Sequence, residues 1–192
     1  AAKNEMTAAG EPPFTVRSAF ADAAFWAPAL ETDESGAASA TFIMPENLTG
    51  WRVKAWAMGH GTFVGEAACT IVTRKEFLLR MQAPRFFIER DHVVLSANVH
   101  NYLDHDARAE VRIELDGGQL ALLGPAVTNV LVPARGEQRV DWRVRAVTEG
   151  SATVRMSARA GAHSDAMQMS FPVHVHGMEK MIPFTRSLRG NQ

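Results

Sequence analysis

The sequence predicts an all-β protein folded as an antiparallel β-sandwich, and three observations support this fold class. Several runs in the second half alternate between apolar and polar residues, which is the period of a half-buried strand. Clusters of Gly, Asp, Asn and Ser separate these runs and mark turns. No stretch has the apolar spacing of an amphipathic helix. We therefore expect short antiparallel strands, each with one buried face.

The clearest strand signals are five stripes of apolar residues at alternate positions, so that the members of a stripe share one face of a strand. The stripes are Val93, Leu95, Ala97 and Val99; Val111, Ile113 and Leu115; Val140, Trp142 and Val144; Val154, Met156 and Ala158; and Met167, Met169, Phe171, Val173 and Val175. Turn signals separate them at residues 104–106, 116–118, 134–136, 149–150 and 161–164. Residues 77–81 and 127–132 add two runs, which gives about seven strands, as in an immunoglobulin or fibronectin type III sandwich.

The first half holds shorter candidate strands. They cover residues 16–20, 25–30, 38–44, 51–58 and 66–72. Trp51, Val53, Ala55 and Ala57 alternate with more polar positions, so their strand should bury one face. The segment from Thr32 to Gly36 is a hairpin signal, because Asp and Ser bond their own backbone and Gly accepts positive φ. Two antiparallel strands should therefore meet across it.

An ordered series of residues resembles one protein family. The series is Phe25, Trp26, Pro28, Gly36, Phe42, Pro45, Asn47, Leu48, Thr49 and Trp51, then Pro84-Arg85-Phe86-Phe87-Ile88, Asp91 and Asn98-Val99-His100-Asn101-Tyr102. It resembles the segment that follows the bait region in alpha-2-macroglobulins, especially the bacterial ones. The resemblance runs from Arg17 to His176.

This resemblance implies a domain division. Residues 1–14 would be a flexible lead-in at the end of the bait region, and their mixture of Ala, Gly, Glu and Pro has no apolar period. Residues 15–73 would be a partial macroglobulin-like domain, whose missing strands come from before the bait region. Residues 74–176 would be a complete macroglobulin-like β-sandwich domain, and residues 177–192 a linker.

Composition excludes several functional classes. The chain has 192 residues, and 20 Lys plus Arg nearly balance 21 Asp plus Glu, so net charge favours neither nucleic acid nor an acidic membrane. No apolar run approaches the ~20 residues of a membrane span. The single cysteine, Cys69, rules out an internal disulfide framework. Beside Ile71 and Val72, this cysteine is expected to be a small core residue rather than a nucleophile.

Several motifs invite a chemical interpretation, and each has a structural alternative. Arg135-Gly136-Glu137-Gln138 resembles the family's Cys-Gly-Glu-Gln thioester sequence, but Arg135 stands at the thiol position, so we expect a hairpin turn. His174 and His176 could form a metal pair, although two ligands do not make a zinc site and an exposed strand end is favoured.

Asn47-Leu48-Thr49 fits a glycosylation acceptor or, more simply, a turn before the next strand. The glycines at 59, 61 and 65 miss the dinucleotide fingerprint and indicate a loop. Catalytic signatures of hydrolases, zinc proteases and phosphate-binding loops are absent from the sequence. We therefore assign no catalytic, cofactor-binding or metal residues.

Five arginines could form a basic patch. They are Arg139, Arg143, Arg145, Arg155 and Arg159, on the polar faces of two strands that we expect to be adjacent. A solvated face, partly balanced by Asp141, Glu110 and Glu114, is favoured over a nucleic-acid site.

The family resemblance implies a non-catalytic structural part of a bacterial alpha-2-macroglobulin-like, broad-spectrum protease inhibitor, which traps proteases after bait-region cleavage. The implied partners are other domains of the parent protein and, through the parent, proteases, in the periplasm or cell envelope. Self-association through the incomplete first module is a further expectation. Two alternatives stay open: an adhesion module that binds carbohydrate or protein, and an enzyme whose residues converge from distant positions.

Overall fold

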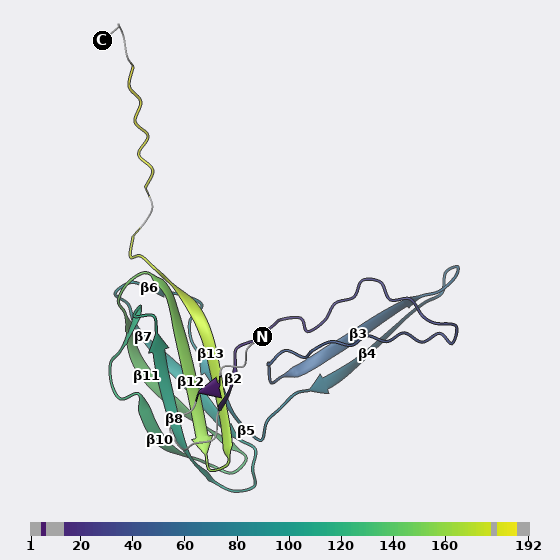
Figure 1. The fold of residues 1–192 in the computed structure, drawn as a ribbon, viewed down its shortest axis with the longest axis horizontal. Coiled ribbons are helices and arrows are strands. Elements are labelled where there is room, and N and C mark those ends of the chain that lie inside the picture. Colours follow the sequence, from purple (N-terminus) through teal and green to yellow (C-terminus); the bar gives the residue numbers. More distant parts are fainter. Residues whose placement is uncertain (1–4, 7–13, 178–179, 188–192) are drawn as a thin grey trace.

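The computed structural model describes residues 5–6, 14–177 and 180–187, and it confirms the all-β fold class. A β-sandwich is joined to a long two-stranded ribbon that projects from one side (Figure 1). In the part of the chain that is described, no helix is long and apolar enough to cross a membrane.

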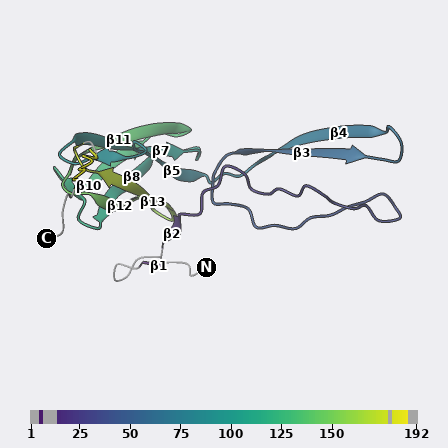
Figure 2. The same cartoon turned by 90° about the horizontal axis from the view of Figure 1, so that it is seen from above.

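The sandwich consists of two sheets, which Figure 2 shows as separate layers. The first sheet follows the order β1 (Glu5–Met6), β2 (Phe14–Arg17), β13 (His163–His174), β12 (Gly150–Ala160), β8 (Ala107–Asp116) and β10 (Val127–Val132), with β6 (Phe87–Ile88) also paired to β13. The second sheet follows the order β5 (Phe77–Gln82), β7 (His92–Asn101), β11 (Gly136–Ala146) and β9 (Leu120–Leu122). Apart from two short parallel pairings of β13, with β2 and β6, the ladders are antiparallel.

The core lies between these sheets, where the alternating stripes meet. The stripes of β7, β8, β11 and β12 are buried, apart from the partly buried Val93 and Leu115 at their ends. Phe87 and Phe171 add an edge-to-face aromatic contact with ring centroids 5.7 Å apart. The fifth stripe departs from the prediction, because Met169 and Val175 are exposed. Val175 follows the end of β13, and β13 is covered on its outer side only over short stretches by β2 and β6.

The ribbon pairs β3 (Gly50–Met58) with β4 (Val64–Val72) along their whole length. Gly59 and Gly61, the latter with φ of +78°, lie in the loop between them, as predicted, whereas Gly65 lies in β4 opposite Ala57, so the loop prediction is wrong for Gly65. Among the described residues, no further strand pairs with this ribbon and no second sheet covers it. The expected burial of one β3 face is therefore wrong: Val53, Ala55 and Ala57 are exposed.

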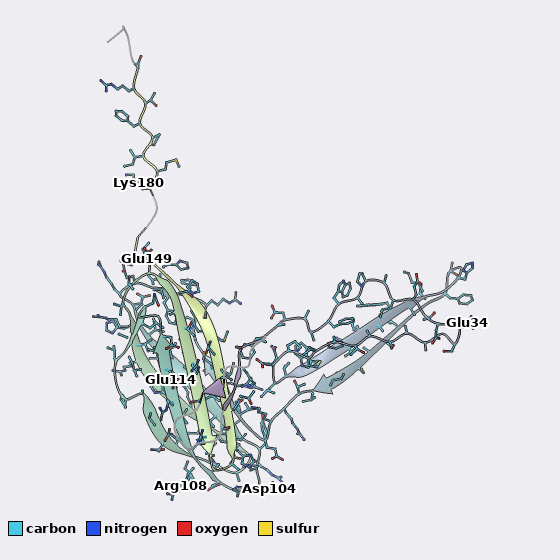
Figure 3. All side chains as sticks on the ribbon, in the orientation of Figure 1. Glu34, Asp104, Arg108, Glu114, Glu149 and Lys180 are labelled. Carbon is cyan, nitrogen blue, oxygen red and sulfur yellow. The ribbon has the colours of Figure 1, made fainter. Side chains whose placement is uncertain are left out.

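The segment that precedes the ribbon runs out and back beside it without forming a ladder, and Glu34 lies near its far end (Figure 3). Its turn is confirmed, because Asp33 Oδ1 accepts hydrogen bonds from Ser35 N, Ser35 Oγ and Ala37 N at 2.9, 2.6 and 2.9 Å. The strands predicted at 25–30 and 38–44 are absent. Phe25 and Phe42 stack with ring centroids 4.7 Å apart, so the two arms are held by side chains.

The strands predicted at 25–30 and 38–44 do not form because no neighbouring strand pairs with them in the described part of the chain. Pro28 cannot donate to a ladder, and an isolated hairpin is at best marginally stable without further strands. Trp26 is consequently 72% exposed.

Short strands escaped the sequence analysis. They are β1, β6 and β9, each of two or three residues, which is too short for a period to be visible. β2, at Phe14–Arg17, begins two residues and ends three residues earlier than the expected strand at 16–20. β1 lies inside the predicted lead-in, most of which lies outside the described residues, as do parts of the predicted linker at 178–179 and 188–192.

Candidate functional site

The most organised polar cluster outside the turns lies where the ribbon joins the sandwich. Asp165 stands on β13 at a position that faces the core, opposite the buried Ala158 of β12. Its side chain is 0% exposed, and that of Arg17 on β2 is 7% exposed. Arg17 Nε donates to Asp165 Oδ1 at 2.9 Å, and Arg17 Nη2 donates to Oδ2 at 2.6 Å. This is a bidentate ion pair, the strongest arrangement that these two groups form.

Other donors complete the coordination of the Asp165 carboxylate. Lys75 Nζ donates to Oδ1 at 2.9 Å, and Leu79 N donates to Oδ2 at 2.9 Å, so each oxygen accepts two hydrogen bonds. Arg17 Nη2 also donates to Leu79 O at 2.8 Å. One carboxylate therefore binds β2, the connection that carries Lys75, and strand β5 of the opposite sheet.

The base of the ribbon is attached to the same cluster. Arg17 Nη1 donates to Glu46 O at 3.4 Å, while Glu46 Oε2 accepts hydrogen bonds from Ser18 N and Ala19 N at 2.6 and 2.8 Å. Beside these contacts lies a cavity of about 230 Å³, lined in part by Arg17, Phe20 and Met167. The cluster therefore holds the start of the ribbon segment against the sandwich.

A second set of hydrogen bonds closes the ribbon at the same end. Thr73 Oγ1 donates to Asn47 O at 2.7 Å and accepts from Trp51 Nε1 at 3.2 Å. Asn47 Oδ1 accepts a hydrogen bond from Ala21 N at 3.0 Å. The side chain of Asn47 thus binds the local backbone just before β3, which agrees with its interpretation as a structural residue.

Sequence reasoning missed this junction. The fifth apolar stripe, extended two residues toward its start, reaches Asp165 at a core-facing position. A carboxylate on a core-facing position needs a buried partner, because an unpaired buried charge is very costly. That signal could have identified Asp165, although it would not have identified Arg17.

The motif at residues 135–138 forms a turn at the start of β11. Arg135 has φ of +53°, and its guanidinium binds the Asp104 carboxylate through Nε and Nη2 at 2.8 and 2.6 Å. The predicted turn is confirmed, but it is not a hairpin turn, because the strands that it joins, β10 and β11, belong to different sheets. Glu137 lies 3.1 Å from His100 Nδ1 on the neighbouring strand. Burial lowers the pKa of His100, and this effect exceeds the opposing attraction of the Glu137 carboxylate.

Cys69 is not a core residue. It lies on β4 and is exposed, so the expectation of a small buried residue is wrong. The sequence pattern around it is that of a covered strand, whereas no described sheet covers the ribbon.

His174 and His176 lie at an exposed strand end. His174 closes β13 and packs edge-on against Phe86, with ring centroids 5.6 Å apart, and His176 follows in an exposed bend. Across the described residues, no group of three or more His, Cys, Asp or Glu side chains could hold a metal ion.

The five arginines do not form one patch. Arg139, Arg143 and Arg145 lie on β11 and Arg155 and Arg159 on β12, and these strands belong to different sheets. The expectation that the two strands are adjacent is wrong, because the turn between them crosses from one sheet to the other. Arg155 Nη1 binds Glu114 at 3.2 Å, and Arg139 Nε binds Asp141 at 2.7 Å, as a solvated face predicts.

The Asp141 group is a small surface network. Its Oδ1 accepts hydrogen bonds from Ser96 Oγ and from Arg139 Nε, each at 2.7 Å. The Ser96 hydroxyl and then the Arg139 guanidinium lower the pKa of Asp141.

Comparison with known proteins finds similarity to one family. The family model described as "Alpha-2-macroglobulin family" matches residues 23–113, which include the ribbon, strands β5, β6 and β7 of the sandwich and most of β8. The chain is 29% identical over 167 residues to an alpha-2-macroglobulin of Thermotoga maritima, and 26% identical over 165 residues to an alpha-2-macroglobulin homolog of a Nostoc species. The matches cover 86% and 85% of this chain, but 11% and 9% of those relatives.

Solved structures share the fold. The native conformation of Escherichia coli alpha-2-macroglobulin matches with a TM-score of 0.55 at 16% identity, over 75% of this chain and 9% of that one. Salmonella alpha-2-macroglobulin reacted with methylamine matches with a TM-score of 0.55 at 18% identity, over 75% of this chain and 10% of that one. The family model and the sequence matches make the chain similar to a segment of alpha-2-macroglobulin family proteins, and the solved structures share its fold.

Proposed function

We propose that this chain is a non-catalytic structural part of a bacterial alpha-2-macroglobulin-like protease inhibitor, and that it lies directly after the bait region. Its role is to connect the cleaved segment of the parent to a rigid module. In such an inhibitor, cleavage of the bait region releases a rearrangement of modules that traps the protease.

The observation that carries this proposal is the buried Arg17–Asp165 junction. Arg17 closes the short strand that emerges from the lead-in, and Asp165 belongs to the core-facing surface of the sandwich. A displacement of the lead-in must therefore either move the sandwich with it or break a buried bidentate ion pair. That is the property required of an element that transmits a cleavage event to its neighbours.

We also propose a division of the chain into domains, which the exposure of the ribbon supports. Residues 15–73 form a partial macroglobulin-like domain, because the ribbon leaves Trp56, Met58 and Phe63 exposed where a complete sandwich would cover such residues. Residues 74–176 form the complete domain, and β2 from the preceding segment adds a short strand to its first sheet. We assign the strands that complete the first domain to the parent protein, ahead of the bait region.

The partners of the chain are accordingly other domains of the parent protein, and proteases are met through the parent. We propose the periplasm or cell envelope as the compartment, which rests on the resemblance to bacterial alpha-2-macroglobulins.

A trapping assay tests the proposal. The chain alone should neither inhibit nor cleave proteases. The parent protein should block trypsin action on a large protein substrate while leaving a small peptide substrate accessible, because a trap excludes substrates by size.

An Asp165→Ala variant of the parent should weaken this block without changing the rate at which the bait region is cleaved. Asp104→Ala is the matched control, since Asp104 forms an exposed ion pair with Arg135. Stoichiometric inhibition by the isolated chain would contradict the proposal, and so would a parent protein that blocks both substrates equally.

Exposed aromatic residues favour a second candidate function, that of a carbohydrate-binding or adhesion module. Trp26, Trp56 and Phe63 are exposed on the ribbon and its adjoining segment, and exposed aromatics commonly stack on sugar rings. Binding of the isolated chain to an oligosaccharide array, abolished by Trp56→Ala, would favour this function over a scaffold.

A further inference from the structure

The outer surfaces of the two sheets differ in how their arginines are neutralised. On the β8–β12 surface, Arg112 Nη2 lies 3.1 Å from Glu110 and Arg155 Nη1 lies 3.2 Å from Glu114. On the β7–β11 surface, Arg143 and Arg145 follow Asp141 along β11, but Asp141 binds Arg139. The second surface therefore carries cationic groups beyond those that its own carboxylates bind.

One of these arginines, Arg145, lines a shallow cleft at one end of the four-stranded sheet. The cleft has a volume of about 330 Å³ and is lined by Arg90, His92, Arg145, Ala146 and Val147, which we call the basic cleft. Arg145 and His92 are directly opposite each other at the end of the β7–β11 ladder. Arg90 comes from the loop that follows β6, so separate segments bring the cationic groups together.

Arg90 has a backbone conformation that L-residues rarely adopt. Its φ is +76°, and it is one of two non-glycine residues with positive φ in the described part of the chain. Arg90 N donates to Ala146 O at 2.9 Å, and Ala146 N donates to Asp91 O at 2.9 Å. These backbone bonds hold the loop against β11 in a conformation that a glycine would adopt at lower cost. An arginine at this position therefore calls for a role of its side chain.

The cationic side chains of the basic cleft have no anionic partner within the described residues. In the described part of the chain, no carboxylate forms an ion pair with Arg90 or Arg145. This includes the nearby carboxylates of Glu89, Asp91 and Glu149. Exposed guanidinium groups that converge on one cleft raise its positive potential and attract anions.

An apolar group lines the same cleft, and another lies beyond its lining on β7. Val147 lines the cleft and is 40% exposed, and Val94, two residues along β7 from the lining residue His92, is 48% exposed. A ligand that fits must combine carboxylate or other oxyanion groups with aliphatic surface. Nucleic acid fits poorly, because its recognition uses rows of cations along a phosphate backbone and aromatic platforms for the bases.

We propose that the basic cleft binds an acidic polypeptide segment, with carboxylates on Arg90 and Arg145, aliphatic side-chain atoms on Val147, and a continuation of the segment past His92 toward the exposed Val94. Guanidinium groups match carboxylates bidentately, and this geometry gives register as well as attraction. The chain covers about a tenth of the relatives it matches, so polypeptide from elsewhere in the parent is a source of such a segment.

Titration with a fluorescein-labelled peptide of alternating Glu and Leu tests this proposal on the full chain. Binding should occur at low ionic strength and weaken steeply as salt is added. Arg90→Gln with Arg145→Gln should weaken it about tenfold, the combined effect expected for two exposed ion pairs. Arg145→Gln alone should weaken it about threefold and leaves the strained loop residue unchanged.

The control variant combines Arg108→Gln with Arg112→Gln. It removes the same charge from the outer surface of the other sheet, and Arg108 lies at the opposite end of the sandwich from Glu149 (Figure 3). Unchanged binding by this control supports the proposal. Equal weakening in both double variants would overturn it, as would absence of binding at low salt. Tighter binding of a sulfated oligosaccharide or of single-stranded DNA of equal charge would assign the cleft to another ligand and overturn it too.

Discussion

Arg17 and Asp165 are 148 residues apart in the sequence, yet they form a buried bidentate ion pair that joins the lead strand of the ribbon segment to the core of the sandwich. Lys75 and the backbone N–H of Leu79 bind the same carboxylate. The Asp165 side chain therefore accepts all four of these hydrogen bonds, and its removal should lower the free energy of unfolding.

The first prediction concerns that side chain. Asp165→Ala leaves Arg17 buried without its counter-charge, and should lower the free energy of unfolding by about 3–5 kcal/mol. Urea denaturation followed by tryptophan fluorescence measures the loss. Asp104→Ala is the control, because Asp104 and Arg135 are 78% and 76% exposed and their pair should contribute less than about 1 kcal/mol. Similar losses in the two variants would show that the buried pair has no special importance.

Trp142 supports a second prediction. It is 3% exposed in the centre of the core, so Trp142→Ala should lower the free energy of unfolding by about 3–5 kcal/mol. Within the described residues its indole Nε1 has no hydrogen-bond partner, so Trp142→Phe should cost clearly less than Trp142→Ala. Trp56→Ala, at an exposed ribbon position, is the control. Denaturant melts decide, and a loss below ~1 kcal/mol for Trp142→Ala would contradict the packing.

The third prediction concerns the ribbon. Its backbone hydrogen bonds join only two strands in the described part of the chain, and its side chains are largely exposed. Hydrogen exchange should therefore be faster in β3 and β4 than in β7, β11 and β12, or else the ribbon should pair with a second copy. Hydrogen exchange combined with light scattering distinguishes these outcomes. A strict monomer whose ribbon is as protected as its sandwich fits neither.

A fourth prediction follows from the pKa of Asp141. Hydrogen bonds from Ser96 and Arg139 place this pKa below the ordinary value in the folded state. The carboxylate therefore stabilises the fold at pH values above the unfolded-state pKa of about 3.9, and this contribution is lost as the pH falls through the lower folded-state pKa. Asp141→Asn should cost up to about 1 kcal/mol at pH 7, because the carboxylate is about half exposed.

Urea melts at neutral and at strongly acidic pH measure this difference, which should shrink in acid. Ser96→Ala should raise the pKa of Asp141 toward its ordinary value and reduce the same pH dependence. A penalty for Asp141→Asn that is constant with pH would show that the carboxylate charge is not responsible.

Most of the sandwich could be predicted from the sequence because its strands are covered on one face. Where a second sheet exists, as for Val140, Trp142 and Val144, alternation in the sequence corresponds to burial in the structure. The same alternation predicted burial in β3, where no described sheet lies opposite, and the prediction failed. Alternation of apolar and polar residues shows which side chains need to be buried, but it does not show whether the sheet that buries them belongs to the same chain.

The junction and the basic cleft were harder to predict for a different reason. Both bring together residues from distant segments. Arg17 binds Asp165, and Arg90 and Arg145 line the same cleft. The arginines of β11 and β12 are close in sequence, yet they lie on separate sheets because the connection between these strands crosses the sandwich. Alternation in the sequence identifies the polar face of a strand, whereas the order of strands in the sheets decides which polar faces lie next to each other.

The edge of β13 that faces away from β12 is partly unpaired, and this has a consequence for solubility. β2 pairs with it at Ala166 and Met167, and β6 pairs with it at Val173 and His174, so the stretch between them is uncovered in the described part of the chain. Pro172 lies in that stretch and has no N–H to offer to an incoming strand. Proline at an open sheet edge discourages aggregation by edge-to-edge pairing. Pro172→Thr, which restores the missing donor, should therefore leave the fold intact while making concentrated solutions of the protein prone to form fibrils.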